Sequence, residues 1–534
     1  MPLNKFGPAF VACLVVLGLA LPGTAPAASR FASGVTAGDI TSSSARLWTR
    51  TSRPGAVLLL VSRSNRGVRC KKPSRVSLLL HPPPPVRRKV LAATPLRDLT
   101  VQTRIKRLRA GTRYRYRFCQ GSKASKVGRF KTAPRKGSGK RIRFAVTGDA
   151  DGAIDPATGK PAYNKFEVYG RMARERNDFN VNLGDVIYSD SAVPNVPVAL
   201  TVQEKWAKYR LNLSYANLRK IRAGTGLYNL WDDHEFIDDF SIPQYGLPLY
   251  QSGKKAFLDY SPAFYGSKYG LYRHYRWGKN LEVFILDERS FRSKSAEADP
   301  ACTNPATGQP DPVPQLPARL RPQLIPNPAF VNFPTAAQCQ AIINDPNRTM
   351  LGKPQLARFM NDIKRSKAKF KVIMNEIPIQ KMYFVPYDRW EGYNAEREAL
   401  LTFLQANVKN VVFLTTDLHA TLINDVRLAN FPEEGVSKDT GMLDFVTGPV
   451  AKNTFGTDAN AQLGNPNASR AVWTLFKTPR PVGLGMRCAS LDVDSYVHVD
   501  VTSKQLTVSP LDQNGKLVHE DDGRQCVPIP IPAR

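Results

Sequence analysis

The chain has 534 residues, 42% of them hydrophobic and 22% charged, with 76 lysines and arginines against 44 acidic residues and a formal net charge of +32. A chain of this length and composition can bury a full hydrophobic core, so a wholly disordered protein is excluded and one large or two ordinary domains are expected. The excess positive charge favours an anionic ligand, although a highly charged surface that serves only solubility accounts for it equally well.

Residues 1–28 predict a secretory signal peptide. Lys5 precedes the apolar run Ala9–Leu21, which is followed by the small-residue pattern Ala25-Pro26-Ala27. The run is too short to span a bilayer comfortably, and no later stretch reaches the about 18 apolar residues of a transmembrane helix. No twin arginine precedes it. We therefore expect a Sec-exported, extracytoplasmic protein without a transmembrane segment.

The cysteines predict disulfides. Six remain once Cys13 leaves with the signal peptide, an even number for an oxidising compartment. A zinc site is the alternative, but the chain has no C-x-x-C spacing that would hold zinc. Their placement suggests local pairs: Cys70–Cys119, Cys302–Cys339 and Cys488–Cys526.

The first part of the chain, residues 29–134, predicts a small β-sandwich. Short runs of strand-forming residues lie between turn residues, at Ala45–Thr49, Ala56–Val61, Val76–Leu80 and Tyr114–Phe118. Residues 135–140 have the glycine, serine and charged content of a linker, so we expect a domain boundary there.

Residues 141–534 predict an α/β domain, because short apolar runs alternate with helical stretches. The expected helices are Asn164–Arg176, Val202–Arg219, Pro354–Arg365 and Ala395–Leu404. The proline-rich segment at about residues 295–345 carries two cysteines, so we expect an insertion stapled by a disulfide rather than a further domain.

Polar side chains follow the predicted strands of this domain. Since ligands bind beyond the carboxyl ends of strands in open α/β sheets, these side chains should converge. A single aspartate at such a position is ordinary helix N-cap chemistry, but five strand ends in order favour a common site. The residues that follow the strands are Asp149, Asp185, Asp232-Asp233-His234-Glu235, Asn375 and Asp417-Leu418-His419.

The predicted cluster is rich in carboxylates, which repel one another unless a cation neutralises them. Oxygen ligands with one or two imidazoles suit calcium, magnesium, manganese or ferric iron. The sequence therefore predicts a metal site at this edge of the sheet.

The ordered motifs resemble those of the calcineurin-like metallophosphoesterases, and within them the PhoD-type alkaline phosphatases/phosphodiesterases. The resemblance covers nearly all of the chain after the signal peptide. It implies an α/β/β/α catalytic domain behind an immunoglobulin- or fibronectin-like sandwich. The motifs are Phe31–Asp39, Ala45–Arg50, Gly184–Tyr188, Trp231–Glu235, Leu286–Arg292, Arg348–Gly352, Asp388–Tyr393 and Thr416–Ala420.

The resemblance also implies a two-metal centre and a role for each ligand. Asp185 would bridge the ions, and His234 would donate a proton to the leaving oxygen or steady the developing charge. The first metal would take Asp149, Tyr188 and His419, and the second Asp233, Asn375 and Asp417. Ferric iron is expected at the first site, where Tyr188 would bind as a phenolate, and calcium at the oxygen-rich second site. Zinc, manganese and magnesium are the alternatives.

Two residues depart from the PhoD pattern or lack a fixed role. Asp149 stands where PhoD enzymes have a cysteine, so it would substitute for that ligand. Asp151 is either a ligand, a residue behind the ligands or a turn residue.

Arg289 is the expected contact to substrate phosphate, because a guanidinium binds phosphate oxygens bidentately. His274 could serve the same purpose or could simply belong to a basic strand. His81, His498 and His519 are not expected to be catalytic.

The resemblance implies a secreted phosphoric ester hydrolase, expected as a monomer, that acts on anionic phosphomonoesters, phosphodiesters or both. A dedicated phosphodiesterase, acting on phospholipid head groups, nucleotides or teichoic-acid-like polymers, is the first alternative. A basic polyanion-binding protein with a vestigial site is the second. The scattered basic residues lack a nucleic-acid-reading motif, so sequence-specific nucleic acid binding is not expected.

Overall fold

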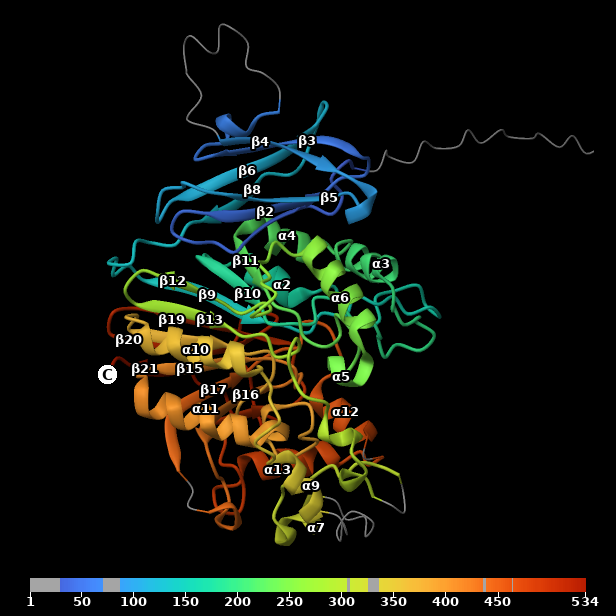
Figure 1. The fold of residues 1–534 in the computed structure, drawn as a ribbon, viewed down its shortest axis with the longest axis vertical. Coiled ribbons are helices and arrows are strands. Elements are labelled where there is room, and N and C mark those ends of the chain that lie inside the picture. Colours follow the sequence, from blue (N-terminus) through green and yellow to red (C-terminus); the bar gives the residue numbers. More distant parts are fainter. Residues whose placement is uncertain (1–28, 71–86, 305–307, 325–335, 436–437, 463) are drawn as a thin grey trace, which may run out of the picture.

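The computed structural model describes residues 29–70, 87–304, 308–324, 336–435, 438–462 and 464–534 (Figure 1). The predicted signal peptide and the predicted strand Val76–Leu80 lie outside these residues. Helices long and apolar enough to cross a membrane do not occur in the described segments.

The N-terminal β region, residues 29–134, contains two antiparallel sheets (Figure 1). Its apolar core is continuous with that of the following domain. In β6, the side chains of Tyr114, Tyr116 and Phe118 are buried, whereas the intervening arginines lie on the opposite face, as the alternating sequence predicts. One sheet contains β1 (Val35–Gly38), β2 (Ala45–Arg50) and β5 (Thr100–Ile105). The other contains β4 (Arg87–Ala93), β3 (Gly55–Ser62), β6 (Arg113–Gln120), β7 (Lys123–Ala124) and β8 (Gly128–Lys131).

The remainder of the described chain is built on two mixed sheets that share one apolar core. In spatial order, the first contains β11 (Gly226–Asn229), β10 (Phe179–Asn182), β9 (Ile142–Thr147), β19 (Ser495–Val501), β20 (Gln505–Asp512) and β21 (Ile529–Pro532). The second contains β12 (Arg273–Trp277), β13 (Leu281–Ile285), β14 (Phe370–Met374), β15 (Val411–Thr415), β17 (Asp439–Val446), β16 (Thr421–Arg427) and β18 (Cys488–Ser490).

Helices cover the outer faces of both sheets, which confirms the α/β/β/α architecture. Side chains of β9 alternate between the inner core, where Phe144 and Val146 lie, and the outer layer, where Ala145 lies. The helices of this outer layer are α2 (Glu167–Met172), α3 (Val202–Asn212), α4 (Ala216–Gly224), α5 (Ile242–Tyr245) and α6 (Leu247–Tyr260). On the second sheet α10 (Lys353–Arg365) and α11 (Asn394–Asn407) pack against Phe284, Ile373 and Phe413. Two further helices are α12 (Phe455–Gln462) and α13 (Ala468–Lys477).

The helix predicted over Val202–Arg219 is two helices in the structure. α3 ends at Asn212, and α4 begins at Ala216. The side chain of Asn212 donates hydrogen bonds to the carbonyl oxygens of Ala150 and Val186, both at 2.8 Å. This link ties the helix end to two loops that carry site residues, a tertiary contact that helical periodicity does not reveal.

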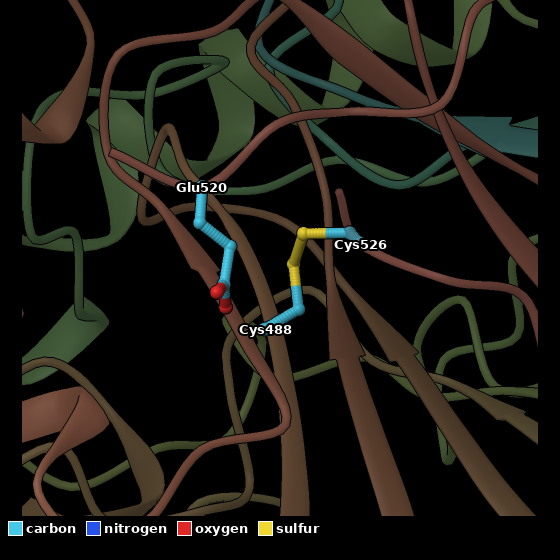
Figure 2. Close-up of side chains that lie close together, drawn as sticks. All are labelled: Cys488, Glu520 and Cys526. Atoms are coloured by element: carbon cyan, nitrogen blue, oxygen red, sulfur yellow. A yellow bond between two sulfur atoms is a disulfide. The ribbon is translucent and has the colours of Figure 1, made fainter. Parts of the chain in front are cut away.

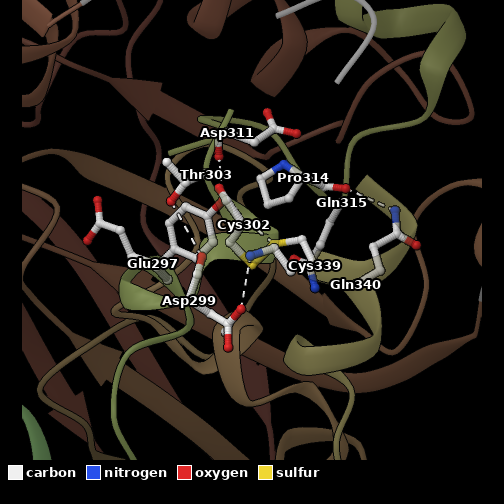
Figure 3. Close-up of a disulfide and its surroundings, with 12 residues drawn as sticks. Glu297, Asp299, Cys302, Thr303, Asp311, Pro314, Gln315, Cys339 and Gln340 are labelled. Atoms are coloured by element: carbon white, nitrogen blue, oxygen red, sulfur yellow. Dashed lines mark hydrogen bonds between the residues drawn. A yellow bond between two sulfur atoms is a disulfide. The ribbon is translucent and has the colours of Figure 1, made fainter. Parts of the chain in front are cut away.

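The described residues of the predicted proline-rich insertion form short turns and helices. They are η3 (Ala296–Ala298), η4 (Pro300–Cys302), η5 (Ala318–Leu320), α7 (Arg321–Leu324) and α9 (Ala336–Ile343). The bond between Cys302 and Cys339 joins its two ends (Figure 3), and Gln340 donates a hydrogen bond to the carbonyl oxygen of Pro314 at 2.9 Å. The predicted pairs Cys70–Cys119 and Cys488–Cys526 are also present, so all three predicted disulfides are confirmed.

Candidate metal centre

Parallel strands bring the predicted ligands to one edge. β10 pairs in parallel with β9 and β11, so the loops that follow these three strands lie side by side. One ligand atom from each of Asp149, Asp185 and His419 lies within 4.8 Å of the other two. Asp185, Asp233 and His234 form a second group of the same kind. Asp185 therefore belongs to both groups, which is the position that a bridging ligand requires.

The loops adopt a backbone conformation that few residues other than glycine tolerate. Asp149, Asp185, Asp417 and His419 all have positive φ, between +49° and +74°. Such conformations cost free energy and persist where the surrounding structure imposes them, most often at functional sites. Gly448, with φ +112°, lies so close to Asp149 that an added Cβ would stand 2.5 Å from its Oδ2 atom.

Three buried oxygen atoms of the predicted ligands lack a hydrogen-bond partner among the described residues. They are both carboxylate oxygens of Asp149 and Oδ1 of Asn375. The side-chain nitrogen of Asn375 donates a hydrogen bond to the carbonyl oxygen of Ile377. Burial, together with the charge of Asp232, raises the pKa of Asp149 well above its ordinary value, and burial also raises that of Asp185. A cation would compensate these oxygens, so the residues present fit a metal site.

Tyr188 lies between the two groups of ligands. Its hydroxyl is 3.1 Å from Nε2 of His419, and its ring centroid is 4.0 Å from that of His234. Burial and the charges of Asp185 and Asp149 raise its phenol pKa well above the ordinary value. A phenolate at this position therefore requires a strong cation beside it. Burial lowers the pKa of His419, which favours the neutral imidazole that binds metals.

His234 is held by two kinds of contact. Its backbone N–H donates to the carboxylates of Asp233 at 2.8 Å and Asp185 at 3.2 Å, and its ring Nδ1 is 2.6 Å from Oδ1 of Asp190. Burial alone would lower the pKa of His234, but the charges of Asp185, Asp233 and Asp190 raise it well above the ordinary value. The protonated imidazole is consequently favoured.

Asp417 is the remaining residue of the predicted second set, and none of the ligand groups among the described residues includes it. It follows β15 and is half-buried. Burial and the charges of Asp232 and Asp388 raise its pKa well above the ordinary value, and Asp233 adds to the same effect. Asp417 thus belongs to the electrostatic environment of Asp233.

Arg289 is engaged in a buried ion-pair network. It is fully buried and binds Asp388 bidentately, with both Nη atoms at 2.7 Å from the carboxylate oxygens, while its Nε donates to Asp232. The Nη2 atom that binds Asp388 also lies 3.5 Å from Oδ2 of Asp233. This geometry favours a role in positioning Asp233 over the direct phosphate contact that the sequence suggested.

Asp151 and His274 have local partners. Asp151 accepts hydrogen bonds from the backbone of Ala153 at 2.9 Å and from the hydroxyl of Ser191 at 2.5 Å, which favours its turn role. His274 Nδ1 lies 2.9 Å from Glu282 on the neighbouring strand β13, which favours its role as a strand residue.

Two residues at the site escaped the sequence analysis. Asp190 follows Tyr188 by two positions, and the frequent pairing of site histidines with a carboxylate is a signal that would have found it. The Lys452 ammonium lies over the Tyr188 ring, 4.7 Å from its centroid. It is placed there because Ala451 pairs with Ala150 in an isolated β-bridge, a long-range contact without a sequence signal.

A further cluster of potential ligands lies elsewhere and is structural. Cys488 and Cys526 form a disulfide beside the carboxylate of Glu520 (Figure 2). Glu520 accepts a hydrogen bond from the backbone of Ala489 at 3.0 Å and forms an ion pair with Lys477. Since disulfide sulfurs are not thiolates, this group is not a zinc site.

Comparison with known proteins assigns the chain to a family. A solved structure described as PhoD superimposes with a TM-score of 0.67 at 22% identity, covering 94% of this chain and 95% of that one. Alkaline phosphatase D of Bacillus subtilis (strain 168) is 26% identical over an alignment of 381 residues, and the match covers 65% of this chain and 57% of that protein. This chain therefore spans little more than half the length of that curated relative.

The family profiles match both parts of the chain. The profile of the PhoD-like phosphatase N-terminal domain matches residues 18–134, and that of the PhoD-like phosphatase matches residues 158–509. The second match alone covers well over half of the chain, which therefore belongs to the PhoD-like phosphatase family.

Proposed function

We propose that this protein is a secreted, metal-dependent phosphatase that hydrolyses phosphomonoesters, phosphodiesters or both. The observation that supports this most directly is the position of Asp185, which contributes to two adjoining groups of ligand atoms. The family membership and the unpartnered oxygens of Asp149 and Asn375 agree with it. The signal peptide and the domain limits at 29–134 and 141–534 are parts of the same proposal.

We assign the ligands as the resemblance implies. Asp149, Tyr188 and His419 would hold one ion, Asp233, Asn375 and Asp417 the other, and Asp185 both. When bound, the two ions would hold the phosphate and lower the pKa of an attacking water towards neutrality. A phenolate and an imidazole favour ferric iron at the first site, whereas the oxygen donors of the second favour calcium.

His234 is the proposed proton donor. Asp190 binds its Nδ1. Its Nε2, which lies 3.5 Å from the exposed carboxylate of Asp238, would give a proton to the leaving oxygen. The charges of Asp185, Asp233 and Asp190 raise the pKa of His234 against the effect of burial, which favours the protonated ring, and a positioned acid contributes roughly 10²- to 10⁴-fold in rate.

Lys452 is the proposed contact to the substrate phosphate. Its ammonium stands over the ring of Tyr188, 4.7 Å from the ring centroid. By contrast, the guanidinium group of Arg289 already forms ion pairs with Asp232 and Asp388. Lys452 is therefore better placed to neutralise a phosphate oxygen.

The test combines hydrolysis with metal content. The purified protein should hydrolyse nitrophenyl phosphate, bis-nitrophenyl phosphate or both, and Asp185→Asn should abolish this activity together with bound metal. A visible absorption band with equimolar iron and calcium would support Tyr188 as a phenolate ligand, whereas zinc or manganese alone would contradict that assignment. Activity on the diester only would favour a dedicated phosphodiesterase. Undetectable hydrolysis in the metal-loaded protein would overturn the proposal.

A further inference from the structure

The positive charge of the chain is concentrated in its N-terminal β region. Residues 29–134 contain 25 lysines and arginines but only two acidic residues, so they contribute a net charge of +23 to the total of +32. Both acidic residues are already paired. Asp39 binds Arg46 and Arg273, and Asp98 binds Arg50 and Arg210. Most cations of this region therefore have no carboxylate within the region to neutralise them.

Six of these cations lie together on one face of a sheet. The register places Arg113 opposite Lys131 and Arg115 opposite Arg129 in strands β6 and β8. Leu60 of β3 lies opposite both Arg117 and Arg88, and this pairing extends the row across to β4. These strands lie at the end of the molecule away from α11 and α13 (Figure 1). The cationic face consists of Arg88, Arg113, Arg115, Arg117, Arg129 and Lys131.

This arrangement is unfavourable for folding alone. Like charges directly opposite each other on a sheet destabilise it. Lys131 forms an ion pair with Asp178 at 2.5 Å, but the other five members form none with a carboxylate of the described residues. Residues 71–86, which the structure does not describe, contain no acidic residue that could pair with these cations. The positive charge of these five cations is therefore left for an external anion to neutralise.

A groove continues the cationic face towards the catalytic domain. It has a volume of about 320 Å³ and is lined by Arg113, Arg115, Arg129 and Lys131 on one side and by residues near the end of α2 on the other. Arg176 adds a further cation there. Glu175 is the acidic residue in this lining, and its carboxylate already accepts a hydrogen bond from Tyr496 at 2.6 Å.

We propose that the cationic face and its groove bind a linear polymer whose backbone carries repeated phosphate groups. Arginine forks match phosphate oxygens bidentately. Cations about 5 Å apart across strands and about 7 Å apart along them present several such contacts to one extended chain. Binding is sequence-independent, because Tyr116 and Phe118 point into the core. Tyr114 and Phe130 line the groove, but they are nearly buried and stack on each other, so they offer no free ring face to a base.

A membrane surface fits this face less well. A peripheral membrane site combines cations with apolar side chains that enter the interface. Val90, 65% exposed, is the large hydrophobic residue that projects from this sheet among its described strands. A groove between two parts of the molecule also suits an extended chain better than a flat bilayer.

The test measures binding of long-chain inorganic polyphosphate to the full-length protein by titration calorimetry at several salt concentrations. Binding should be much tighter than that of orthophosphate and should weaken linearly in logarithmic plots against salt. The variant Arg113→Gln/Arg115→Gln/Arg129→Gln should weaken it by about tenfold or more. The control Lys364→Gln/Arg365→Gln/Lys367→Gln removes the same charge from exposed positions near the end of α10 and should change affinity less than about twofold.

Three outcomes would overturn the proposal: no binding by the wild-type protein, equal weakening in both triple variants, or binding to anionic phospholipid vesicles without binding to polyphosphate. Repeating the titration with Asp185→Asn separates the cationic face from the metal centre, and the affinity should persist in that variant. Nitrophenyl phosphate hydrolysis should be unchanged in both triple variants. A failure of the proposed phosphatase activity would leave the binding result intact, so the two proposals fail separately.

Discussion

The imidazole of His234 and the carboxylate of Asp190 lie 2.6 Å apart, from Nδ1 to Oδ1. The second oxygen of Asp190 accepts a hydrogen bond from the backbone of Asp238 at 2.7 Å, so the carboxylate cannot rotate freely. Burial alone would raise the pKa of Asp190, but the positive charge of the His234 imidazole and its hydrogen bond lower it to about 2. Asp190 is therefore ionised at neutral pH and fixes the orientation and protonation of the His234 ring.

Asp190→Asn should lower kcat about 10- to 100-fold, because an amide can hold Nδ1 but cannot stabilise the protonated ring. The bound metal should remain, since Asp190 is outside the proposed ligand set. The measurements are kcat across pH and elemental analysis of the variant. Asp155→Asn, in which a turn carboxylate bound to Ala157 and Thr158 is replaced, is the control. An unchanged pH profile in Asp190→Asn would contradict a positioning role.

Lys452→Met should raise the inhibition constant for orthophosphate and the KM for nitrophenyl phosphate, each by about tenfold, because one charge-assisted contact is lost. Lys254→Met is a matched control, since Lys254 lies over the ring of Tyr250 at 4.8 Å in similar cation–π geometry. The control should leave both constants unchanged. Equal effects in the two variants would show that Lys452 acts through packing alone.

The closeness of Asp149 and Asp185 was predictable, because it depends on parallel pairing of strands whose apolar runs and ends can be recognised in the sequence. Asp149 and Asp185 directly follow short apolar runs, and parallel strands place such positions at one edge. The partners of Arg289 were not predictable in this way. Asp388 is 99 positions away, and its contact depends on how the loop after β14 returns to the sheet. The sequence analysis correctly expected Arg289 to bind an anion. Because Arg289 is buried, its partners are carboxylates of the chain itself and not a substrate phosphate.

Asp388→Asn should destabilise the protein by about 3–5 kcal/mol, because it leaves the buried guanidinium groups of Arg289 and Arg292 with incomplete partners. The free energy of unfolding in urea measures this loss. Asp439→Asn removes one partner of a partly exposed pair with Arg427, and should cost less than about 1 kcal/mol. Similar values for the two variants would show that the buried network contributes no more than a surface ion pair.

The pair of Glu282 and His274 predicts a pH-dependent contribution to stability. Burial alone would raise the pKa of Glu282, but hydrogen bonds from His274 and Ser366 and the charge of His274 lower it from 4.5 to about 2. The unfolded chain therefore takes up a proton on Glu282 before the folded protein does. The stabilisation is fully present above pH 4.5 and is lost as the pH falls towards 2.

Glu282→Gln removes this titration, so wild type and variant should differ most in unfolding free energy at pH 7. Between pH 5 and 3 the difference should shrink by about 2 kcal/mol, at 1.36 kcal/mol for each pH unit once the unfolded carboxyl is protonated. Urea unfolding at intervals across this range measures it, and the comparison cancels the titration of all other carboxyls. A difference that stays constant from pH 7 to 3 would show that the hydrogen bonds from His274 and Ser366 hold neutral and charged Glu282 equally.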